Sequence, residues 1–266
     1  MKKGIRGHDV ERKGLVAICE RCKEVDLPYI QLVCERSVEG FEFGKFSEEY
    51  ASEIKEMLDG TKVAVLGSYI NPSNSDSDAL SYDLARFKEK IRYATVLNPI
   101  LVGTETCSYR DGENDSEEAY ATLLKSMKEL ACEAEKYGVT IGIEGVHFHV
   151  INKPEKLAKL VNDIGSDNVK VIFDPCNYIT INNYQKQNEM INTMFDLLGD
   201  KIAIIHAKDF VIENGRVKSA IPGEGMLNYS LIFERLKALG LDVPFICEEI
   251  NEKDAVKAFE NLEKYE

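Results

Sequence analysis

Four chemically active side chains stand at or near the ends of four successive apolar segments. They are Glu144, Asp174, His206 and Glu248, within residues 139–146, 169–175, 202–209 and 244–250. A carboxylate at a strand end contributes nothing to packing, although an aspartate there can cap the next helix. Three carboxylates and one imidazole suit a divalent cation, which would also relieve the repulsion between them. We therefore predict a metal site built from these four residues.

Further titratable groups lie beside these four or at the ends of earlier apolar segments. We expect them to line a pocket around the metal site: His8, Glu105, His147, His149, Lys208 and Asp209. His147 and His149 are two residues apart, so both point to one side if their strand continues that far. One of them could then donate a hydrogen bond to a metal-binding carboxylate without binding the metal itself, as supporting residues of metal sites commonly do.

The elements that must position these residues are eight short apolar segments that alternate with amphipathic ones. The first four apolar segments are residues 4–7, 29–34, 62–69 and 99–106, and clear helical patterns cover 47–60, 81–98, 116–138 and 229–240. Gly60, Gly138 and Gly240 each follow such a pattern, where a left-handed C-cap is expected. Eight alternations without a linker predict a single (β/α)8 TIM barrel, one domain over residues 1–266. No GxGxxG or GxxxxGK[ST] follows a strand, which disfavours an open nucleotide-binding sheet.

The composition is that of an ordinary globular protein, and it disfavours some classes of function. The formal net charge is −13, whereas proteins that bind nucleic acid neutralise phosphates with Lys and Arg. No apolar run approaches the roughly 20 residues of a membrane span, and no apolar signal segment follows Lys2 and Lys3. We therefore expect a cytoplasmic protein with a small-molecule substrate, no nucleic acid partner and no membrane partner. The sequence is compatible with a homo-oligomer.

Six motifs carry a resemblance to a known family. They are "VGTETCSYR", "IGIEGVHFHV", "VIFDPCN", "IIHAKDF", "PGEGMLNY" and "FICEE". In their order and spacing they resemble the xylose-isomerase-like TIM-barrel superfamily, in its sugar phosphate isomerase/epimerase branch. Relatives there include ketose 3-epimerases and inosose isomerases and dehydratases. The resemblance runs from "IRGHD" near the N-terminus to the eighth strand, so it covers nearly the whole chain.

The resemblance implies roles for individual residues. It makes Glu144, Asp174, His206 and Glu248 the metal ligands, with Glu144 and Glu248 also acting as the acid/base pair. It implies substrate contacts from His149, Asn177 and Lys208, with Asp209 in a supporting role. From their positions alone, we expect His8 and Glu105 to contact the substrate as well and His147 to support the site. Two positions depart from the family pattern. Gly145 stands where proline is common, and Asn177 stands where many relatives carry the histidine of D-x-x-H.

The implied activity is that of a metal-dependent sugar isomerase or epimerase. It would remove a proton next to a carbonyl of a ketose or keto-cyclitol and pass through an enediolate. One divalent ion is expected, Mn²⁺ in preference to Zn²⁺, Co²⁺ or Mg²⁺, because most of the donors are hard oxygens. The alternatives are a metal-dependent keto-inositol dehydratase and an endonuclease IV-like enzyme with three zincs. The nuclease is disfavoured by the chain's four histidines and its acidic charge.

Overall fold

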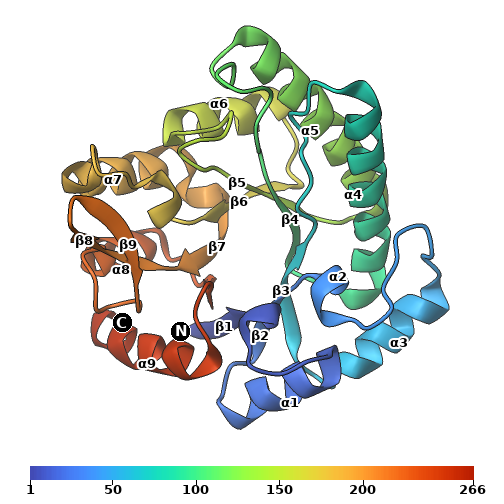
Figure 1. Ribbon diagram of the computed structural model, residues 1–266, viewed down its shortest axis with the longest axis horizontal. Coiled ribbons are helices and arrows are strands. Elements are labelled where there is room, and N and C mark those ends of the chain that lie inside the picture. Colours follow the sequence, from blue (N-terminus) through green and yellow to red (C-terminus); the bar gives the residue numbers. More distant parts are fainter.

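Eight parallel strands form one closed barrel (Figure 1). The computed structural model describes all residues, 1–266. Around the barrel the order is β1-β10-β7-β6-β5-β4-β3-β2, so each strand lies beside its neighbour in the chain. The strands are β1 Lys2–Arg6, β2 Tyr29–Leu32, β3 Lys62–Gly67, β4 Leu101–Glu105, β5 Ile141–Glu144, β6 Val169–Phe173, β7 Ile202–Ala207 and β10 Pro244–Cys247. This confirms the predicted TIM barrel.

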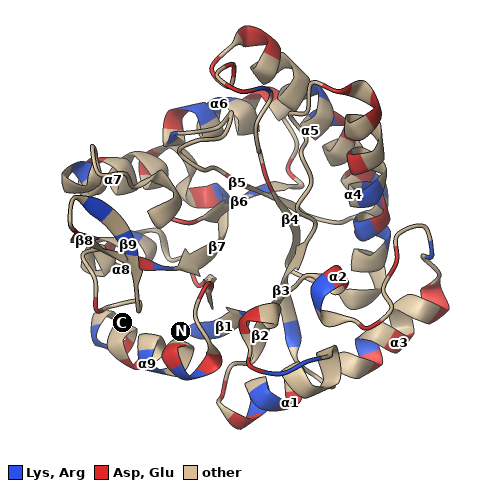
Figure 2. Ribbon diagram, viewed as in Figure 1, with Lys and Arg blue, Asp and Glu red and all other residues tan.

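Helices surround the barrel on its outside (Figure 1). They are α1 Leu15–Glu24, α2 Cys34–Ser37, α3 Glu48–Leu58, α4 Ser77–Leu97, α5 Glu117–Tyr137, α6 Pro154–Ile164, α7 Gln187–Leu198, α8 Tyr229–Leu239 and α9 Glu252–Leu262. None of them combines the length and the apolar run that crossing a bilayer would require. Acidic and basic residues are interspersed along this outer ring (Figure 2), as is typical of a solvated face.

Local signals in the sequence account for several helix ends. The Asn228 side chain accepts a hydrogen bond from the backbone N–H of Leu231 and so caps α8, as asparagine commonly does. Gly138 and Gly240 end α5 and α8 in the left-handed region, with φ of 64° at both, as predicted. The prediction for Gly60 is wrong by one residue. Asp59 takes the left-handed cap position instead, with φ of 44°.

An antiparallel hairpin interrupts the predicted alternation after β7. The strand predicted to run to residue 209 ends at Ala207, and the hairpin follows as β8 (Asp209–Glu213) and β9 (Arg216–Ala220). Its turn residues Asn214 and Gly215 both have positive φ, 51° and 71°, which suits the tight turns that join two twisted strands. The hairpin lies outside the barrel sheet and covers a cavity of about 240 Å³ beside the barrel mouth.

The interior of the barrel is filled with apolar side chains. One buried cluster joins Ala64, Val65, Leu101, Ile172, Ile204 and Ile246. These residues come from strands that are not all neighbours in the sheet, so they meet inside the barrel. At Gly103, an added Cβ would lie only 2.7 Å from Val65 Cγ1. Because the interior is closed in this way, the functional groups gather at the strand ends, where such barrels hold their active sites.

Candidate active site

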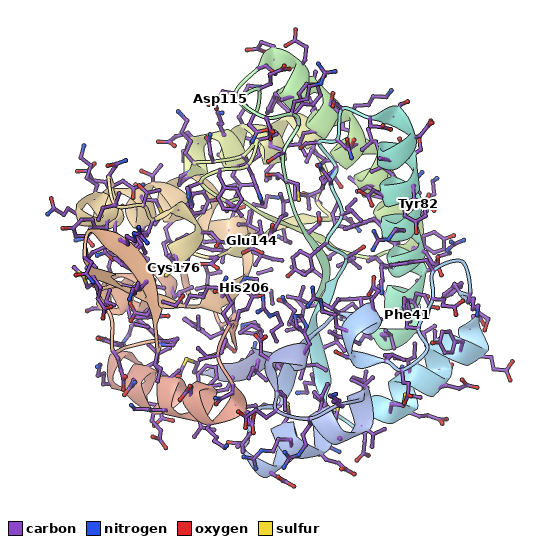
Figure 3. All side chains as sticks on the ribbon, in the orientation of Figure 1. Phe41, Tyr82, Asp115, Glu144, Cys176 and His206 are labelled. Atoms are coloured by element: carbon purple, nitrogen blue, oxygen red, sulfur yellow. The ribbon has the colours of Figure 1, made fainter.

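Each predicted metal ligand lies at the carboxyl end of its strand. Glu144 is the last residue of β5, Asp174 follows β6, His206 is near the end of β7, and Glu248 follows β10. These four strands are consecutive around the barrel, so the four side chains meet at one rim. All four are buried, with at most 5% of each residue exposed. Figure 3 shows Glu144 and His206 near the barrel centre, whereas Asp115 lies far out on the surface.

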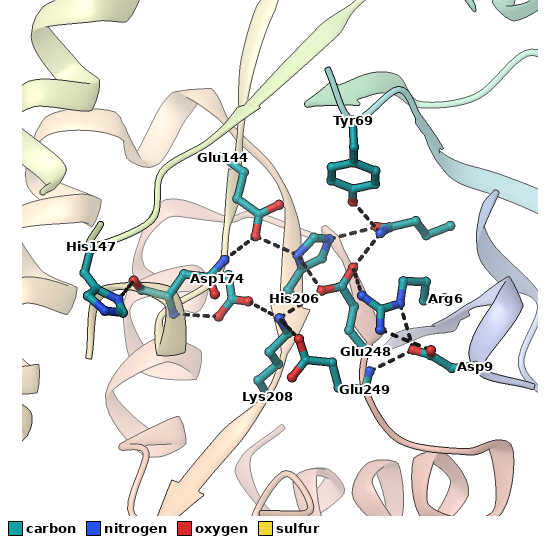
Figure 4. A network of polar contacts seen from close by, with 12 residues as sticks. Arg6, Asp9, Tyr69, Glu144, His147, Asp174, His206, Lys208, Glu248 and Glu249 are labelled. Carbon is teal, nitrogen blue, oxygen red and sulfur yellow. Dashed lines mark hydrogen bonds and ion pairs between the residues drawn. The ribbon is translucent and has the colours of Figure 1, made fainter. Parts of the chain in front are cut away.

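Three of the four predicted ligands are close enough to share one ion. Glu144, Asp174 and His206 each offer a ligand atom, and these atoms lie within 4.8 Å of one another. The His206 Nδ1 atom lies 3.1 Å from Glu144 Oε1 and 3.6 Å from Glu248 Oε2. Glu248 therefore lies next to His206, but it does not belong to the group of three residues whose ligand atoms are all close to one another (Figure 4).

A buried glutamine that the sequence analysis did not single out fixes the imidazole of His206. The side-chain Nε2 of Gln31 donates to Tyr69 Oη at 2.6 Å and to Glu248 Oε1 at 2.5 Å. Its Oε1 therefore faces His206 Nε2, 2.9 Å away, and accepts a hydrogen bond from the N–H there. Because Nε2 carries that proton, the other nitrogen, Nδ1, is the one that can bind an ion.

The ammonium group of Lys208 lies between two of the predicted ligands. Its Nζ atom is 3.1 Å from Asp174 Oδ2, 3.0 Å from Glu248 Oε2 and 3.3 Å from Glu249 Oε1 (Figure 4). Asp174 Oδ2 is buried and has no hydrogen bond of acceptable geometry, so the charge of Lys208 is its only partner. A buried carboxylate oxygen without a hydrogen bond is a natural ligand for a cation. The donor set thus fits a divalent ion, and binding requires the Lys208 ammonium group to move out from between Asp174 and Glu248.

The displacement of this lysine leads to a prediction about metal affinity. Lys208→Met removes a positive charge that occupies the space between Asp174 and Glu248. We expect the variant to bind Mn²⁺ about tenfold more tightly, roughly 1.4 kcal/mol, by titration calorimetry. Lys218→Met, on the exposed hairpin, is the matched control and should leave the affinity unchanged. Weaker binding by Lys208→Met would mean that the lysine holds the ligands in place and does not compete with the ion.

The buried charges shift one another's protonation. Burial raises the pKa of Glu144, and the neighbouring His206 opposes that rise. Burial acts in the same direction on Glu248, but His206 and Lys208 outweigh it and hold its pKa at about 2. For His206, burial lowers the pKa, yet the carboxylates of Glu248 and Glu144 prevail and raise it to about 9. Without an ion, the imidazole is therefore protonated at neutral pH.

Metal binding should consequently depend on pH. An ion at Nδ1 of His206 must expel the proton held there, so below a pKa of about 9 protons compete with the metal. We expect the apparent Mn²⁺ affinity to fall by up to about tenfold for each unit of decreasing pH. Calorimetry in buffers of different ionisation enthalpy would detect the released proton. An affinity that is independent of pH would exclude His206 as a ligand.

Asp174 uses its two oxygens for different purposes. Oδ1 accepts a hydrogen bond from the backbone N–H of Asn177 at 3.2 Å, so the aspartate does cap the turn that follows β6. Oδ2 faces Lys208 in the cluster. The Asn177 side chain donates from Nδ2 to Glu144 Oε1 at 2.7 Å, and its carbonyl oxygen accepts from the backbone N–H of His147. Asn177 thus joins β5 to β6 directly above the cluster.

A cavity of about 670 Å³ adjoins the cluster at Glu248 and Lys208, although Glu144, Asp174 and His206 are not in its wall. Its volume is within the usual range for small-molecule sites. The predicted residues His8, Glu105, Asn177, Lys208 and Glu248 lie in its wall. Burial and the neighbouring Glu144 raise the pKa of Glu105 to about 7. Burial also lowers the pKa of His8.

The strand does not continue to the two histidines after β5, so the condition for both to point to one side is not met: β5 ends at Glu144 and a turn follows. His147 is exposed, and its Nδ1 lies 3.0 Å from the carbonyl oxygen of Asn177. His149 is buried, 3.7 Å from Glu105. Neither ring bonds to Glu144. His206 is thus the only histidine beside the carboxylate cluster. A three-zinc nuclease would need several histidine ligands there.

Asp209 lies apart from the cluster and organises the loop that contains Pro222–Gly225. Its carboxylate accepts hydrogen bonds from the backbone N–H groups of Phe210, Gly223, Gly225 and Leu227, at 2.8–3.0 Å. A Gly-rich loop before a helix could in principle bind phosphate through such amides. In this protein the amides of Gly223 and Gly225 already donate to the carboxylate of Asp209. Gly225 has no room for a side chain, because an added Cβ would lie 2.2 Å from Asp209 Oδ1.

Comparisons with known proteins agree with the barrel. The family profile described as "Xylose isomerase-like TIM barrel" matches residues 19–265, nearly the whole chain. The uncharacterized protein MJ1311 of Methanocaldococcus jannaschii is 33% identical over 146 residues. That match covers 53% of this chain and 47% of the relative, so the chain spans about half the length of this curated relative.

Two solved structures superpose on the full chain. A D-tagatose 3-epimerase-like protein has a TM-score of 0.79 and 23% identity, and the match covers 100% of this chain and 97% of that one. The IOLI protein with a bound zinc atom has a TM-score of 0.77 and 20% identity, with 100% and 96% covered. At these identities the likeness establishes a shared fold and leaves the substrate open.

Proposed function

The chain belongs to the xylose isomerase-like TIM barrel family, and we propose on this basis that it is a divalent-metal-dependent isomerase or epimerase of a ketose or keto-cyclitol. The observation that carries the proposal is the buried group of Glu144, Asp174 and His206. A cavity of about 670 Å³ adjoins it through Glu248 and Lys208. Glu248 is the proposed fourth ligand. Mn²⁺ is the preferred ion over Zn²⁺, Co²⁺ and Mg²⁺, because carboxylate oxygens predominate among the donors.

The proposed chemistry is proton transfer at the carbon next to a carbonyl. When bound, the ion supplies Lewis-acid polarisation of that carbonyl. Glu144 and Glu248 face the same imidazole, 3.1 and 3.6 Å from its Nδ1, so they are suited to flank a substrate above it. Glu144 Oε1 accepts from Asn177, which holds the carboxylate in place for proton abstraction. Epimerisation requires a second group on the opposite face, whereas isomerisation can use one. We assign this second role to Glu248.

The proposed substrate is a free sugar or cyclitol without a phosphate. The amides of the loop at Pro222–Gly225, which would be the natural phosphate site, are bonded to Asp209. The cavity wall offers instead neutral and ionic groups that bind hydroxyls, among them Tyr69, Asn177 and Lys208. Polar groups of this kind fix the orientation of a small polar ligand.

The test is a proton–deuterium exchange screen over ketoses and inososes in D₂O with added Mn²⁺. Exchange at the carbon beside the carbonyl reports the shared proton-transfer step, whatever the final product. We expect at least one of these compounds to exchange in a metal-dependent manner. Exchange accompanied by loss of water would point to the dehydratase. A complete absence of exchange over both classes, in protein shown to contain metal, would contradict the proposal.

A further inference from the structure

The imidazole of His149 lacks the hydrogen bonds that a buried ring normally makes. Only 6% of this residue is exposed, and its Nδ1 atom is buried without a partner. Its Nε2 atom lies 3.7 Å from Glu105 Oε2, which is too far for a hydrogen bond. Buried polar atoms in folded proteins are nearly always satisfied, by protein groups or by a bound species. Neither nitrogen of the ring thus has a hydrogen-bond partner, and Nε2 is the one that faces Glu105.

A third donor completes the surroundings of this ring. One oxygen of Glu105, the sulfur of Cys107 and one nitrogen of His149 lie within 4.8 Å of one another. Two hydrogen bonds fix the loops that carry them. The Val150 N–H donates to the carbonyl oxygen of Cys107 at 3.0 Å, and the Ile151 N–H donates to Thr106 Oγ1 at 3.3 Å. The donors are thus brought together by the backbone and not by flexible side chains alone.

We propose that Glu105, Cys107 and His149 form a second divalent-cation site, selective for zinc, beside the substrate cavity. Sulfur, nitrogen and oxygen donors together favour zinc, whereas a thiolate does not suit Mg²⁺ or Mn²⁺. Two ligand atoms 3.7 Å apart can both reach one zinc ion at about 2.0–2.2 Å. Binding would expel the thiol proton to solvent and release the contact of Cys107 Sγ with the Ile70 carbonyl, 3.3 Å long.

This second site shares no residue with the Glu144, Asp174 and His206 group. The two sites nevertheless lie close together, because Glu105 and Glu144 are paired across β4 and β5. Glu105 also forms part of the cavity wall. Three protein ligands leave a fourth position of a tetrahedral ion open, as in zinc sites that bind water or substrate. That open position would face the cavity, so the second ion would be placed to bind a substrate oxygen.

Cobalt substitution tests the second site independently of activity. The protein is stripped with a chelator, kept reduced and given two equivalents of CoCl₂ per chain. A cobalt ion bound to a thiolate produces a sulfur-to-cobalt charge-transfer absorption band, which the carboxylate cluster cannot give. We expect this band in the parent protein and its complete loss in Cys107→Ser and in His149→Leu. His149 has no side-chain hydrogen bond to lose, so His149→Leu should fold.

Two controls separate this proposal from the other cysteines and from the proposed function. Cys132→Ser removes an exposed cysteine on α5 and should keep the band. Asp174→Asn damages only the carboxylate cluster, so it should keep the band as well, even if the protein proves to have no isomerase activity. The proposal is overturned if the parent protein shows no band, if Cys107→Ser keeps it, or if His149→Leu keeps it.

Discussion

Glu144→Gln is expected to lower the metal-dependent proton exchange rate by about 10³-fold, within the range seen when a catalytic base is removed. The carboxylate is 2% exposed, and burial raises its pKa in the metal-free protein. Glutamine keeps the shape and can still accept from Asn177 Nδ2 through its amide oxygen. It cannot take a proton from carbon. The rate is measured at saturating Mn²⁺, with the sugar that the exchange screen identifies.

The matched control for this variant is Glu129→Gln, an exposed glutamate on α5 that pairs with Lys88. It should exchange at the parental rate. Thermal unfolding should show that Glu144→Gln remains folded. If Glu144→Gln retains most of the parental rate, another group is the base. Glu105, which lies in the cavity wall with a pKa raised to about 7 by burial and Glu144, would then be the residue to examine.

Asp174→Asn is expected to weaken Mn²⁺ binding by about 100-fold or more, roughly 2.7 kcal/mol. The substitution removes one negative charge from the cluster and turns the Oδ2 position into a neutral amide atom. Asparagine can still accept the Asn177 N–H through its Oδ1 atom, so the cap of the turn is kept. Lys208 also keeps Glu248 and Glu249 as partners. The affinity is measured by calorimetry, beside a stability measurement of the metal-free protein.

Asp115→Asn serves as the control, because Asp115 is exposed on the rim of the molecule and pairs with Lys156. It should bind Mn²⁺ like the parent protein. An unchanged affinity in Asp174→Asn would mean that this aspartate is a cap alone. The metal would then have to be held by other groups, and the interpretation of the cluster would fail.

The barrel could be predicted from the sequence because its pattern is local. Apolar runs of strand length, amphipathic helices and capping residues such as Asn228 can all be recognised without knowledge of distant contacts. The rim positions of Glu144, Asp174, His206 and Glu248 follow from the same alternation. Parallel strands end at a common face, so residues at four consecutive strand ends must come close together.

Contacts between distant segments could not be predicted in this way. Gln31 is a single polar residue in a strand of otherwise apolar and aromatic residues, and nothing near it in the sequence reveals its contacts with Tyr69 and His206. The placement of Lys208 between two carboxylates depends equally on the closed barrel.

The hairpin is a different case, since its signal was present in the sequence. Asn214 and Gly215 form the dipeptide that most strongly favours a tight hairpin turn. Residues 209–213 and 216–220 flank it and form the two strands. Lys208 and Asp209 directly continue the apolar run of β7, so the end of that strand at Ala207 has no marker in the sequence.

Binding of a divalent ion by the four strand-end residues can be tested by X-ray diffraction from crystals grown with MnCl₂, recorded at a wavelength where manganese scatters anomalously. We expect one strong anomalous peak bound by Glu144, Asp174, Glu248 and the Nδ1 atom of His206, with Lys208 withdrawn from between Asp174 and Glu248. Diffraction that shows no peak there, with Lys208 still between the two carboxylates, would contradict this expectation. The lysine would then be the permanent counter-ion of the cluster, and the proposed metal-dependent chemistry would be wrong.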